Sequence, residues 1–336
     1  MTLRLGTRRS ALAVAQSRTV AAALRRQTGR DVEIVEIVTI GDRSTAPVAR
    51  LGVGVFVSAL RDALTAKEID FAVHSYKDLP TAMPDGLRVA AVPRRADPRD
   101  ALVARDGRTL ADLGPGARIG TGSVRRIAQL HALGRQFEPV PIRGNVDTRL
   151  KKVADGELDA LVLARAGLAR LGREDEITET LDPMLMLPAP AQGALAVECR
   201  AEDSELAELL AALDDPYTRA AVTAERALLA ELEAGCSAPV AALAEVVEAD
   251  PAGPPGAQQP VQPHAGRDAE RQIYLRGAAF SPDGTQAIRL SRTGSLTDAA
   301  QVGRLLAADL RDAGADGLVA PVLAGAPDDD ALGVQP

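Results

Sequence analysis

The sequence predicts an α/β protein with two lobes of mostly parallel sheets and a small C-terminal α+β domain. Three observations support this fold class. Short apolar runs alternate with helical segments through residue 200, which favours parallel sheets. Proline-rich segments at residues 93–100 and 187–193 divide this part into two halves of similar size. Beyond residue 203, two long helices are followed by strands and a hairpin turn.

The first half contains four predicted strands and two predicted helices. Ser10 follows the turn of residues 7–10 and is placed to cap the first helix. The glycine-containing segment 41–54 is expected to be a mobile loop between the second strand and the second helix. The strands are predicted at residues 3–6, 32–39, 69–73 and 87–92, and the helices at 11–27 and 55–67.

The second half repeats this alternation, and the chain then returns to the first sheet. Strands are predicted at residues 101–104, 117–119, 140–142 and 158–164, a helix ends at 167–172, and strand 194–199 joins the first sheet. The last part has helices at 203–213, 217–233 and 297–313 and strands at 240–247, 272–280 and 286–291. Residues 250–268 are predicted to form a flexible insertion, and the tail 324–336 is expected to be disordered.

These elements define three predicted domains and a known type of architecture. Domain 1 comprises residues 1–95 and 194–213, domain 2 residues 99–190, and domain 3 residues 215–322. Two α/β halves joined by two crossovers resemble the two-lobed fold of periplasmic binding proteins. In that fold the ligand lies between the lobes and the crossovers act as a hinge.

Composition excludes several classes of protein. The chain has 336 residues, a net charge of −7, 2% aromatic residues and no tryptophan, so nucleic-acid binding would need a local basic patch. Two cysteines and three histidines give neither a disulfide framework nor a metal-ligand spacing, and we expect no metal site. The N-terminus lacks a signal-peptide pattern, and no apolar run is long enough to cross a membrane. We therefore expect a cytoplasmic protein without a membrane or nucleic-acid partner.

Two similar segments, at residues 120–126 and 142–149, combine glycine turns with arginines. Each follows a short apolar run and contains a residue that can cap a helix, Ser123 or Asn145. Single arginines at such positions are often solvated, but a buried cluster of like charges is unstable unless a ligand neutralises it. We therefore expect a ligand with several negative groups. Neither segment matches a phosphate P-loop, so the identity of the anion stays open. The cluster comprises Arg125, Arg126, Arg143 and Arg149.

Two further features bear reactive groups. Lys77 and Asp78 are predicted just past the carboxyl end of strand 69–73, where open α/β sheets bind ligands, although an exposed turn pair explains them equally. Cys236 lies between a glycine and a serine in a turn after a long helix, where an exposed thiol is a nucleophile or an attachment point. Cys199, inside an apolar strand, is expected to be a buried apolar side chain.

Taken in order, several short segments resemble the porphobilinogen deaminase (hydroxymethylbilane synthase) family of tetrapyrrole biosynthesis. Each segment alone is weakly specific, but all of them occur in register over residues 3 to about 320. The segments are residues 7–10, 73–80, 120–126, 142–149, 192–194 with 198–200, and 235–236.

The resemblance implies an enzyme that adds four porphobilinogen molecules, each with loss of ammonia, to a covalently bound dipyrromethane cofactor. Water then releases the linear tetrapyrrole hydroxymethylbilane. Cys236 would hold the cofactor through a thioether, and Asp78 would be the catalytic carboxylate that stabilises the cation left when the amine departs. We also expect a monomer, and by analogy with the family uroporphyrinogen-III synthase would take the product.

The resemblance also assigns the remaining site residues. Gln192 would lie at the hinge, and Phe56 matches an aromatic residue of the active-site loop. The sequence departs from the family at Val53, where lysine is common, at Tyr76, where methionine is common, and at Gly122, where serine is common. The cofactor- and substrate-binding positions are Arg8, Ser10, Lys77, Thr121, Ser123, Arg125, Arg126, Arg143, Gly144, Arg149, Arg170 and Gln192.

Two other functions remain possible on the residues alone. A two-lobed anion-binding module, such as a solute receptor or a sensor domain, would explain the lobes and the arginines. It would not explain Lys77 and Asp78 together with a loop thiol at Cys236. A nucleic-acid-binding protein is disfavoured by the acidic charge and the low aromatic content.

Overall fold

The computed structural model describes residues 2–38, 55–233, 238–248 and 271–319, and three sheets lie within these ranges. Segment 41–54, Val53, Cys236, the 250–268 insertion and the tail fall outside the described residues. Phe56 lies in a described helix, but its side chain does not belong to the described part.

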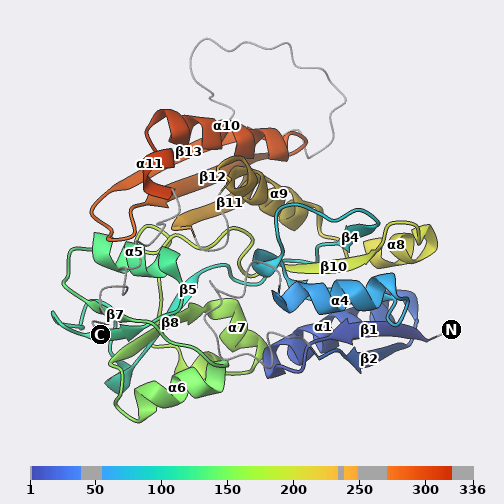
Figure 1. The fold of residues 1–336 in the computed structure, drawn as a ribbon, viewed down its shortest axis with the longest axis horizontal. Helices are drawn as coiled ribbons and strands as arrows, with labels where there is room; N and C mark the ends of the chain where they lie inside the picture. The colour runs from blue at the N-terminus through green and yellow to red at the C-terminus, as the bar shows by residue number, and fades with distance from the viewer. Residues whose placement is uncertain (1, 39–54, 234–237, 249–270, 320–336) are drawn as a thin grey trace, which may run out of the picture.

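Lobe 1, which contains the N-terminus, is a five-stranded sheet in the order β2-β1-β3-β10-β4 (Figure 1). The prediction that the strand after the second crossover returns to this sheet is confirmed, because β10 lies antiparallel between β3 and β4. The strands are β1 (Leu3–Thr7), β2 (Val32–Glu36), β3 (Phe71–Ser75), β4 (Leu87–Ala91) and β10 (Leu195–Arg200), and the helices are α1 (Ala11–Thr28), α4 (Val55–Thr65) and α8 (Ser204–Ala211).

Lobe 2 has a sheet of the same form, in the order β7-β6-β8-β5-β9. Its strands are β5 (Asp100–Ala104), β6 (Arg118–Gly120), β7 (Glu138–Val140), β8 (Ala160–Ala164) and β9 (Glu179–Thr180). Its helices are α5 (Val124–Ala132), α6 (Val146–Ala154) and α7 (Arg165–Arg170), with short 3-10 turns η2 (Arg105–Gly107) and η3 (Glu174–Glu176).

One strand in each sheet opposes the other four, so the sheets are mostly parallel as predicted. The opposing strands, β5 and β10, are the first strands after the two crossovers. Each crossover therefore enters the next sheet at the edge where the parallel strands of that sheet end, and its first strand runs in the opposite direction. This arrangement gathers both crossovers close to the carboxyl ends of the parallel strands.

The third domain is an antiparallel sheet, β11-β12-β13, with helices on one face and lobe 2 on the other (Figure 1). Alternate residues of β11 explain this: Val240 and Ala242 face the helices, whereas Ala241 and Leu243 pack with Ala128 of α5. The elements are α9 (Pro216–Glu231), β11 (Val240–Glu248), β12 (Arg271–Phe280), β13 (Ala287–Ser295), α10 (Ala299–Asp312) and α11 (Asp316–Val319).

Several local predictions need correction. Strand β3 runs through Ser75, two residues further than predicted, so His74 is a buried strand residue that contacts Glu198 rather than a loop residue. Strand β2 ends at Glu36, short of the predicted boundary, and the two-residue strand β9 was not predicted. The caps at Ser10 and Asn145 are confirmed, whereas the Ser123 side chain makes no capping hydrogen bond. The domain boundaries themselves stay predictions.

Candidate active site

The turn after β3, residues 76–80, is the centre of the candidate site. It forms a 3-10 turn, η1 (Tyr76–Asp78), closed by the Leu79 N–H on the Tyr76 carbonyl at 3.2 Å and anchored by the buried Leu79 side chain. Lys77 is half-buried, and Asp78 is exposed. The Asp78 carboxylate makes no hydrogen bond or ion pair with the described part of the chain, so its oxygens are available to a ligand.

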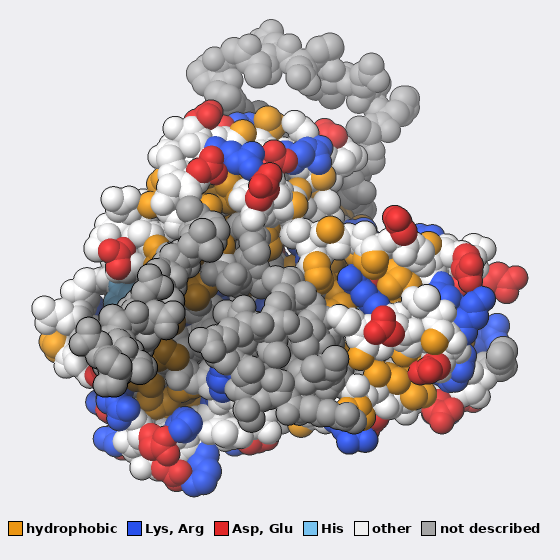
Figure 2. Space-filling model, in the orientation of Figure 1, with side chains coloured by type: hydrophobic (Ala, Val, Ile, Leu, Met, Phe, Trp, Pro, Cys, Tyr) orange, Lys and Arg blue, Asp and Glu red, His pale blue; other side chains and the backbone are white. Residues whose placement is uncertain are grey.

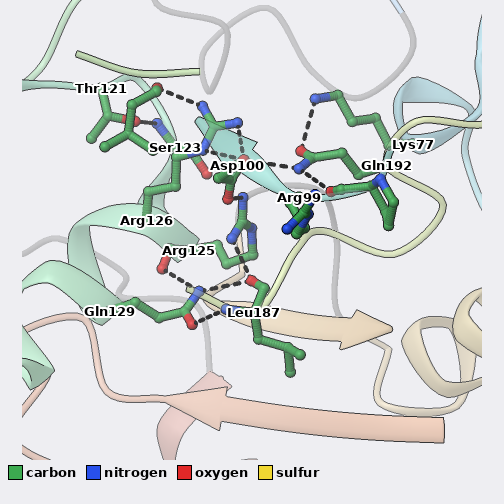
Figure 3. Close-up of polar contacts among 12 residues, drawn as sticks. Lys77, Arg99, Asp100, Thr121, Ser123, Arg125, Arg126, Gln129, Leu187 and Gln192 are labelled. Atoms are coloured by element: carbon green, nitrogen blue, oxygen red, sulfur yellow. Dashed lines mark hydrogen bonds and ion pairs between the residues drawn. The ribbon is translucent and has the colours of Figure 1, made fainter. Parts of the chain in front are cut away.

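Gln192, on the second crossover, links this turn to lobe 2. Its Oε1 accepts a hydrogen bond from Lys77 Nζ at 3.2 Å, and its Nε2 donates to Asp100 Oδ1 and to the Pro98 carbonyl, both at 2.8 Å (Figure 3). The Gln192 side chain is fully buried. The hinge position predicted for Gln192 therefore corresponds to a bridge between the β3 turn and the start of β5.

Asp100 is the buried carboxylate at the centre of this network. Asp100 Oδ2 lies 2.7 Å from Arg125 Nη2, and Asp100 Oδ1 lies 2.7 Å from Arg126 Nη2 (Figure 3). Burial alone would raise the pKa of Asp100, but the charges and hydrogen bonds of the two arginines outweigh it and hold the pKa well below its ordinary value. Asp100 is therefore ionised.

Asp100 changes how the arginine cluster is interpreted. The chain itself supplies the counter-charge for Arg125 and Arg126, which are both buried, so these two do not require an external anion. Arg125 also donates through Nη1 to the Leu187 carbonyl, which Gln129 contacts as well. Arg125 thus holds the second crossover against α5.

Arg149, further along the cluster, has no acidic partner among the described residues. Arg149 is half-buried and donates from Nε to the Gly144 carbonyl at 2.9 Å, while Arg143 is exposed. Burial, and then the charges of Arg126 and Arg143, lower the pKa of Arg149. An anion bound here would remove this unfavourable effect, so a negatively charged ligand is still expected at this part of the cluster.

A hollow of about 300 Å³, including its open mouth, lies between the lobes. Lys77 and Arg170 bring positive charge to it from opposite lobes. Burial lowers the pKa of Lys77 to about 8; the charge of Asp78 opposes this shift and the charge of Arg126 adds to it. Burial also lowers the pKa of Arg170, to about 10. Arg170 also donates to the Gly193 carbonyl at 2.6 Å. Two partly desolvated cations suit a ligand with separate carboxylates.

The remaining predicted residues lie around these groups or outside the described chain. Arg8 is half-buried in the turn before α1, which Ser10 caps by accepting from the Ala13 N–H at 3.3 Å. Thr121 is buried, and its hydroxyl accepts from the Ser123 N–H at 3.3 Å. The structure therefore joins Lys77 to Gln192, and joins Gln192 to Arg125 and Arg126 through Asp100. It does not test Cys236.

Sequence reasoning missed three charged residues of this region, namely Asp100, Glu225 and Arg226. Glu225 is fully buried, binds Arg95 Nη1 at 2.6 Å and accepts from the Ala191 N–H. The available signal was a charged residue at the edge of an otherwise apolar segment: Asp100 begins strand β5, and Glu225 and Arg226 interrupt an alanine- and leucine-rich helix.

The described residues contain neither a metal-ligand cluster nor a helix long and apolar enough to cross a bilayer. Their charged side chains are mixed in sign on the face drawn in Figure 2, as expected from the many surface ion pairs. Cys199 is buried as predicted, and burial raises its pKa to about 11.

The fold and the site together define a two-lobed α/β protein with cations between its lobes and an exposed carboxylate, Asp78, next to one of them in sequence. Comparison with known proteins shows the family. Residues 3–208 match the family described as "Porphobilinogen deaminase, dipyromethane cofactor binding domain", and residues 219–312 match "Porphobilinogen deaminase, C-terminal domain". The chain belongs to the porphobilinogen deaminase family.

Named relatives agree with this assignment. The chain is 58% identical to "Porphobilinogen deaminase" of Mycobacterium tuberculosis, over 93% of this chain and 97% of that protein. It is 56% identical to the protein of the same name from Nocardia farcinica, over 97% of this chain and 90% of the relative.

Solved structures of two-lobed proteins are more distant. The Bordetella pertussis BvgS VFT2 domain is 19% identical, covers 63% of this chain and 86% of its own, and gives a TM-score of 0.38. The methionine-binding protein MetQ is 12% identical, covers 62% and 88%, and gives 0.40. The description of the lobes therefore rests on their strand order alone.

Proposed function

We propose that this chain joins four porphobilinogen molecules head to tail, with release of ammonia, on a dipyrromethane cofactor and then releases hydroxymethylbilane by hydrolysis. The observation that carries the proposal is the exposed Asp78 carboxylate beside Lys77, at the carboxyl end of β3, in a chain of this family. An anion-binding module would need the cations of the cleft but would have no use for an unpaired acid among them.

The cations of the cleft fit the cofactor. Each of its two pyrrole rings carries an acetate and a propionate, and Arg149 and Arg170 are half-buried cations without an acidic partner among the described residues. When bound, the cofactor supplies the free pyrrole carbon to which substrate is added. We assign its thioether attachment to Cys236, which follows soon after the end of α9.

Asp78 acts at the reacting ring in this proposal. As the substrate amine departs as ammonia, the ring becomes a cation, and a carboxylate hydrogen-bonded to the pyrrole N–H stabilises that charge. After the new carbon–carbon bond forms, the same carboxylate can accept the proton that the attacked carbon loses. Its lack of partners in the described chain leaves its oxygens accessible.

The remaining polar residues bind and orient. We assign Lys77, Arg8, Arg143, Arg149 and Arg170 to the carboxylates of the cofactor and substrate, which explains why one cleft holds so many cations. We also assign to ligand binding Ser10, Thr121, Ser123 and Gly144, which lie in the segments that follow strands β1, β6 and β7. Arg125, Arg126 and Gln192 hold the cleft wall through Asp100.

Three further expectations remain predictions: that the protein is a monomer, that it is cytoplasmic, and that uroporphyrinogen-III synthase takes its product. The roles of the Phe56 side chain and of the Val53 substitution also remain predictions, since neither side chain belongs to the described part of the chain.

The test is the intact mass of protein made in a host that synthesises porphobilinogen. We expect the wild-type mass to exceed the sequence mass by one dipyrromethane unit, and Cys236→Ser to show the bare sequence mass and no turnover. Wild-type protein of bare sequence mass would contradict the cofactor assignment. A binding module would carry no such covalent addition.

Asp78→Asn is the matched variant that separates covalent attachment of the cofactor from the catalysed reaction. The amide keeps the size of the side chain and loses the charge, so the fold should persist while turnover falls roughly 10²-fold or more. Wild-type turnover in Asp78→Asn would remove this residue from the mechanism.

A further inference from the structure

Arg226, on α9 of the third domain, holds the backbone of the β3 turn in lobe 1. Its Nη1 donates to the Leu79 carbonyl at 3.0 Å and to the Tyr76 carbonyl at 3.3 Å, and its Nη2 donates to the Pro80 carbonyl at 2.6 Å. The guanidinium also lies over the Tyr76 ring, 4.4 Å from its centroid. These contacts bracket Lys77 and Asp78 on both sides in sequence.

The geometry of the turn explains why such a contact is needed. A single 3-10 turn is closed by few internal hydrogen bonds, here the Leu79 N–H on the Tyr76 carbonyl, and it leaves the following carbonyls without helical partners. Arg226 is itself buried, at 9% exposure, and its planar fork reaches several carbonyls at once. Lysine at this position could not make the same set of bonds.

The neighbouring residue gives α9 a second attachment in the same region. Glu225 binds Arg95 of the first crossover through both carboxylate oxygens, at 2.6 and 3.0 Å, and accepts from the Ala191 N–H of the second crossover. Consecutive residues of one helix therefore hold the hinge and the turn that bears Asp78. The same helix leads toward Cys236.

We propose that Arg226 is a positioning residue for catalysis, which fixes the turn of Lys77 and Asp78 relative to the third domain. The inference rests on the proposed function only for its catalytic consequence. Since misplacement of a reacting group by about 1 Å can cost roughly 10²-fold in rate, a clamp on three carbonyls around Asp78 should matter chiefly for the chemical step.

The experiment uses the full-length, cofactor-bearing enzyme and the variant Arg226→Gln. Hydrogen exchange of the 75–81 segment should become about tenfold faster, while the β11–β13 sheet exchanges as in wild type. The kcat per cofactor-bearing molecule, counted by intact mass, should fall about tenfold or more, with KM changed less than about threefold.

Arg219→Gln is the matched control. Arg219 also lies on α9 and also donates to a lobe 1 carbonyl, that of Ala90 at 3.1 Å, but it does not contact the β3 turn. Exchange of segment 75–81 and kcat should stay within about twofold of wild type in this variant. Equal losses in the two variants would show that Arg226 acts only through general docking of the domain.

Two milder variants keep the proposal testable if Arg226→Gln does not fold. Tyr76→Met removes the ring under the guanidinium and keeps the carbonyls, and Arg226→Lys keeps the charge but not the fork. Both should speed exchange of segment 75–81 and lower kcat by a few-fold. If hydrogen exchange of segment 75–81 is unchanged in the variants that fold, the proposed role of Arg226 is overturned. If wild-type protein carries no cofactor and shows no turnover, the proposed function is overturned instead. The exchange result then still decides whether Arg226 holds the turn.

Discussion

Lys77 combines a low pKa with a place on the wall of the cleft. Burial is the main cause of its lowered pKa of about 8, the charges of Arg126 and Arg125 add to it, and those of Asp78 and Asp100 oppose it. Its one hydrogen bond to protein among the described residues goes to Gln192, so the other ammonium protons can reach a ligand. The charge of Lys77 therefore changes within the working pH range of many enzymes.

This charge should be visible in the pH dependence of substrate binding. Lys77 is charged below about pH 8 and neutral above it, so the KM for porphobilinogen should rise as pH increases through 8. In Lys77→Gln, KM should be higher than in wild type below about pH 8, and this rise should be absent. Initial rates over a range of substrate concentrations, between about pH 6.5 and 9.5, measure it.

The control for Lys77 is Lys152→Gln, which removes a surface lysine paired with Glu157 and should leave the profile as in wild type. The same rise in KM in Lys77→Gln would assign it to another group, such as the amine of the substrate, which titrates identically in every variant.

Helix α5 illustrates how two elements depend on one buried charge. Arg125 and Arg126 occupy its first turn, at the positive end of the helix dipole, where cations are unfavourable. Asp100, at the start of β5, offsets both charges and also binds Gln192. The β5 strand, α5 and the second crossover are therefore joined through a single carboxylate.

Asp100→Asn should lower the free energy of unfolding by about 3–5 kcal/mol, because it leaves two buried guanidinium groups without their counter-charge. In wild type, the low pKa of Asp100 means that its stabilisation is complete above the ordinary pKa of 3.8 and is lost as pH falls below it. Urea denaturation at neutral pH gives the comparison with wild type.

Asp97→Asn serves as the control for Asp100, since Asp97 lies nearby but pairs with the more exposed Arg99. Asp97→Asn should lower the free energy of unfolding by about 1 kcal/mol or less. Similar losses for the two variants would mean that Asp100 does not carry the stability of this junction.

Local patterns predicted most elements of the chain but not their partners. Apolar runs and caps gave the strands and helices to within a few residues, as for α1 and β12, because these signals lie within each element. The motif at residues 120–126 identified Arg125 and Arg126 as site residues. Their partner Asp100 is 25 residues away in sequence, and only the folded sheet brings it beneath α5.

Contacts from distant residues and the ends of short strands were the second limit on prediction. Lys77 and Asp78 were expected together past β3, and they are, yet the clamp from Arg226 comes from 150 residues further along the chain. His74 was misplaced because alternation in a short buried strand does not show where the strand ends. Long-range polar contacts leave little trace in a single sequence.

At the scale of the molecule, the third domain is joined to both lobes by different means. It meets lobe 2 through an apolar contact that includes Ala128, Leu187 and Phe280, and lobe 1 through the polar contacts of α9. The domain that leads to Cys236 is thus held against the arginine helix and the Asp78 turn together. Relative motion of the lobes would have to strain one of these contacts.

The turn between β12 and β13 tests this docking. Gly284 has a φ of +69°, and a Cβ added there would lie 2.4 Å from the Ala128 carbonyl and 2.6 Å from His131 Cβ on α5. Gly284→Ala should therefore lower the free energy of unfolding by about 1–2 kcal/mol because of its backbone conformation. The clash with lobe 2 should lower it by roughly 1–3 kcal/mol more. Gly86→Ala is the matched control, because Gly86 has a φ of +79° and open space around its Cβ position, so it should show the backbone loss alone. Urea denaturation of both variants gives the difference, and equal losses would mean that the β12–β13 turn does not pack on α5 in solution.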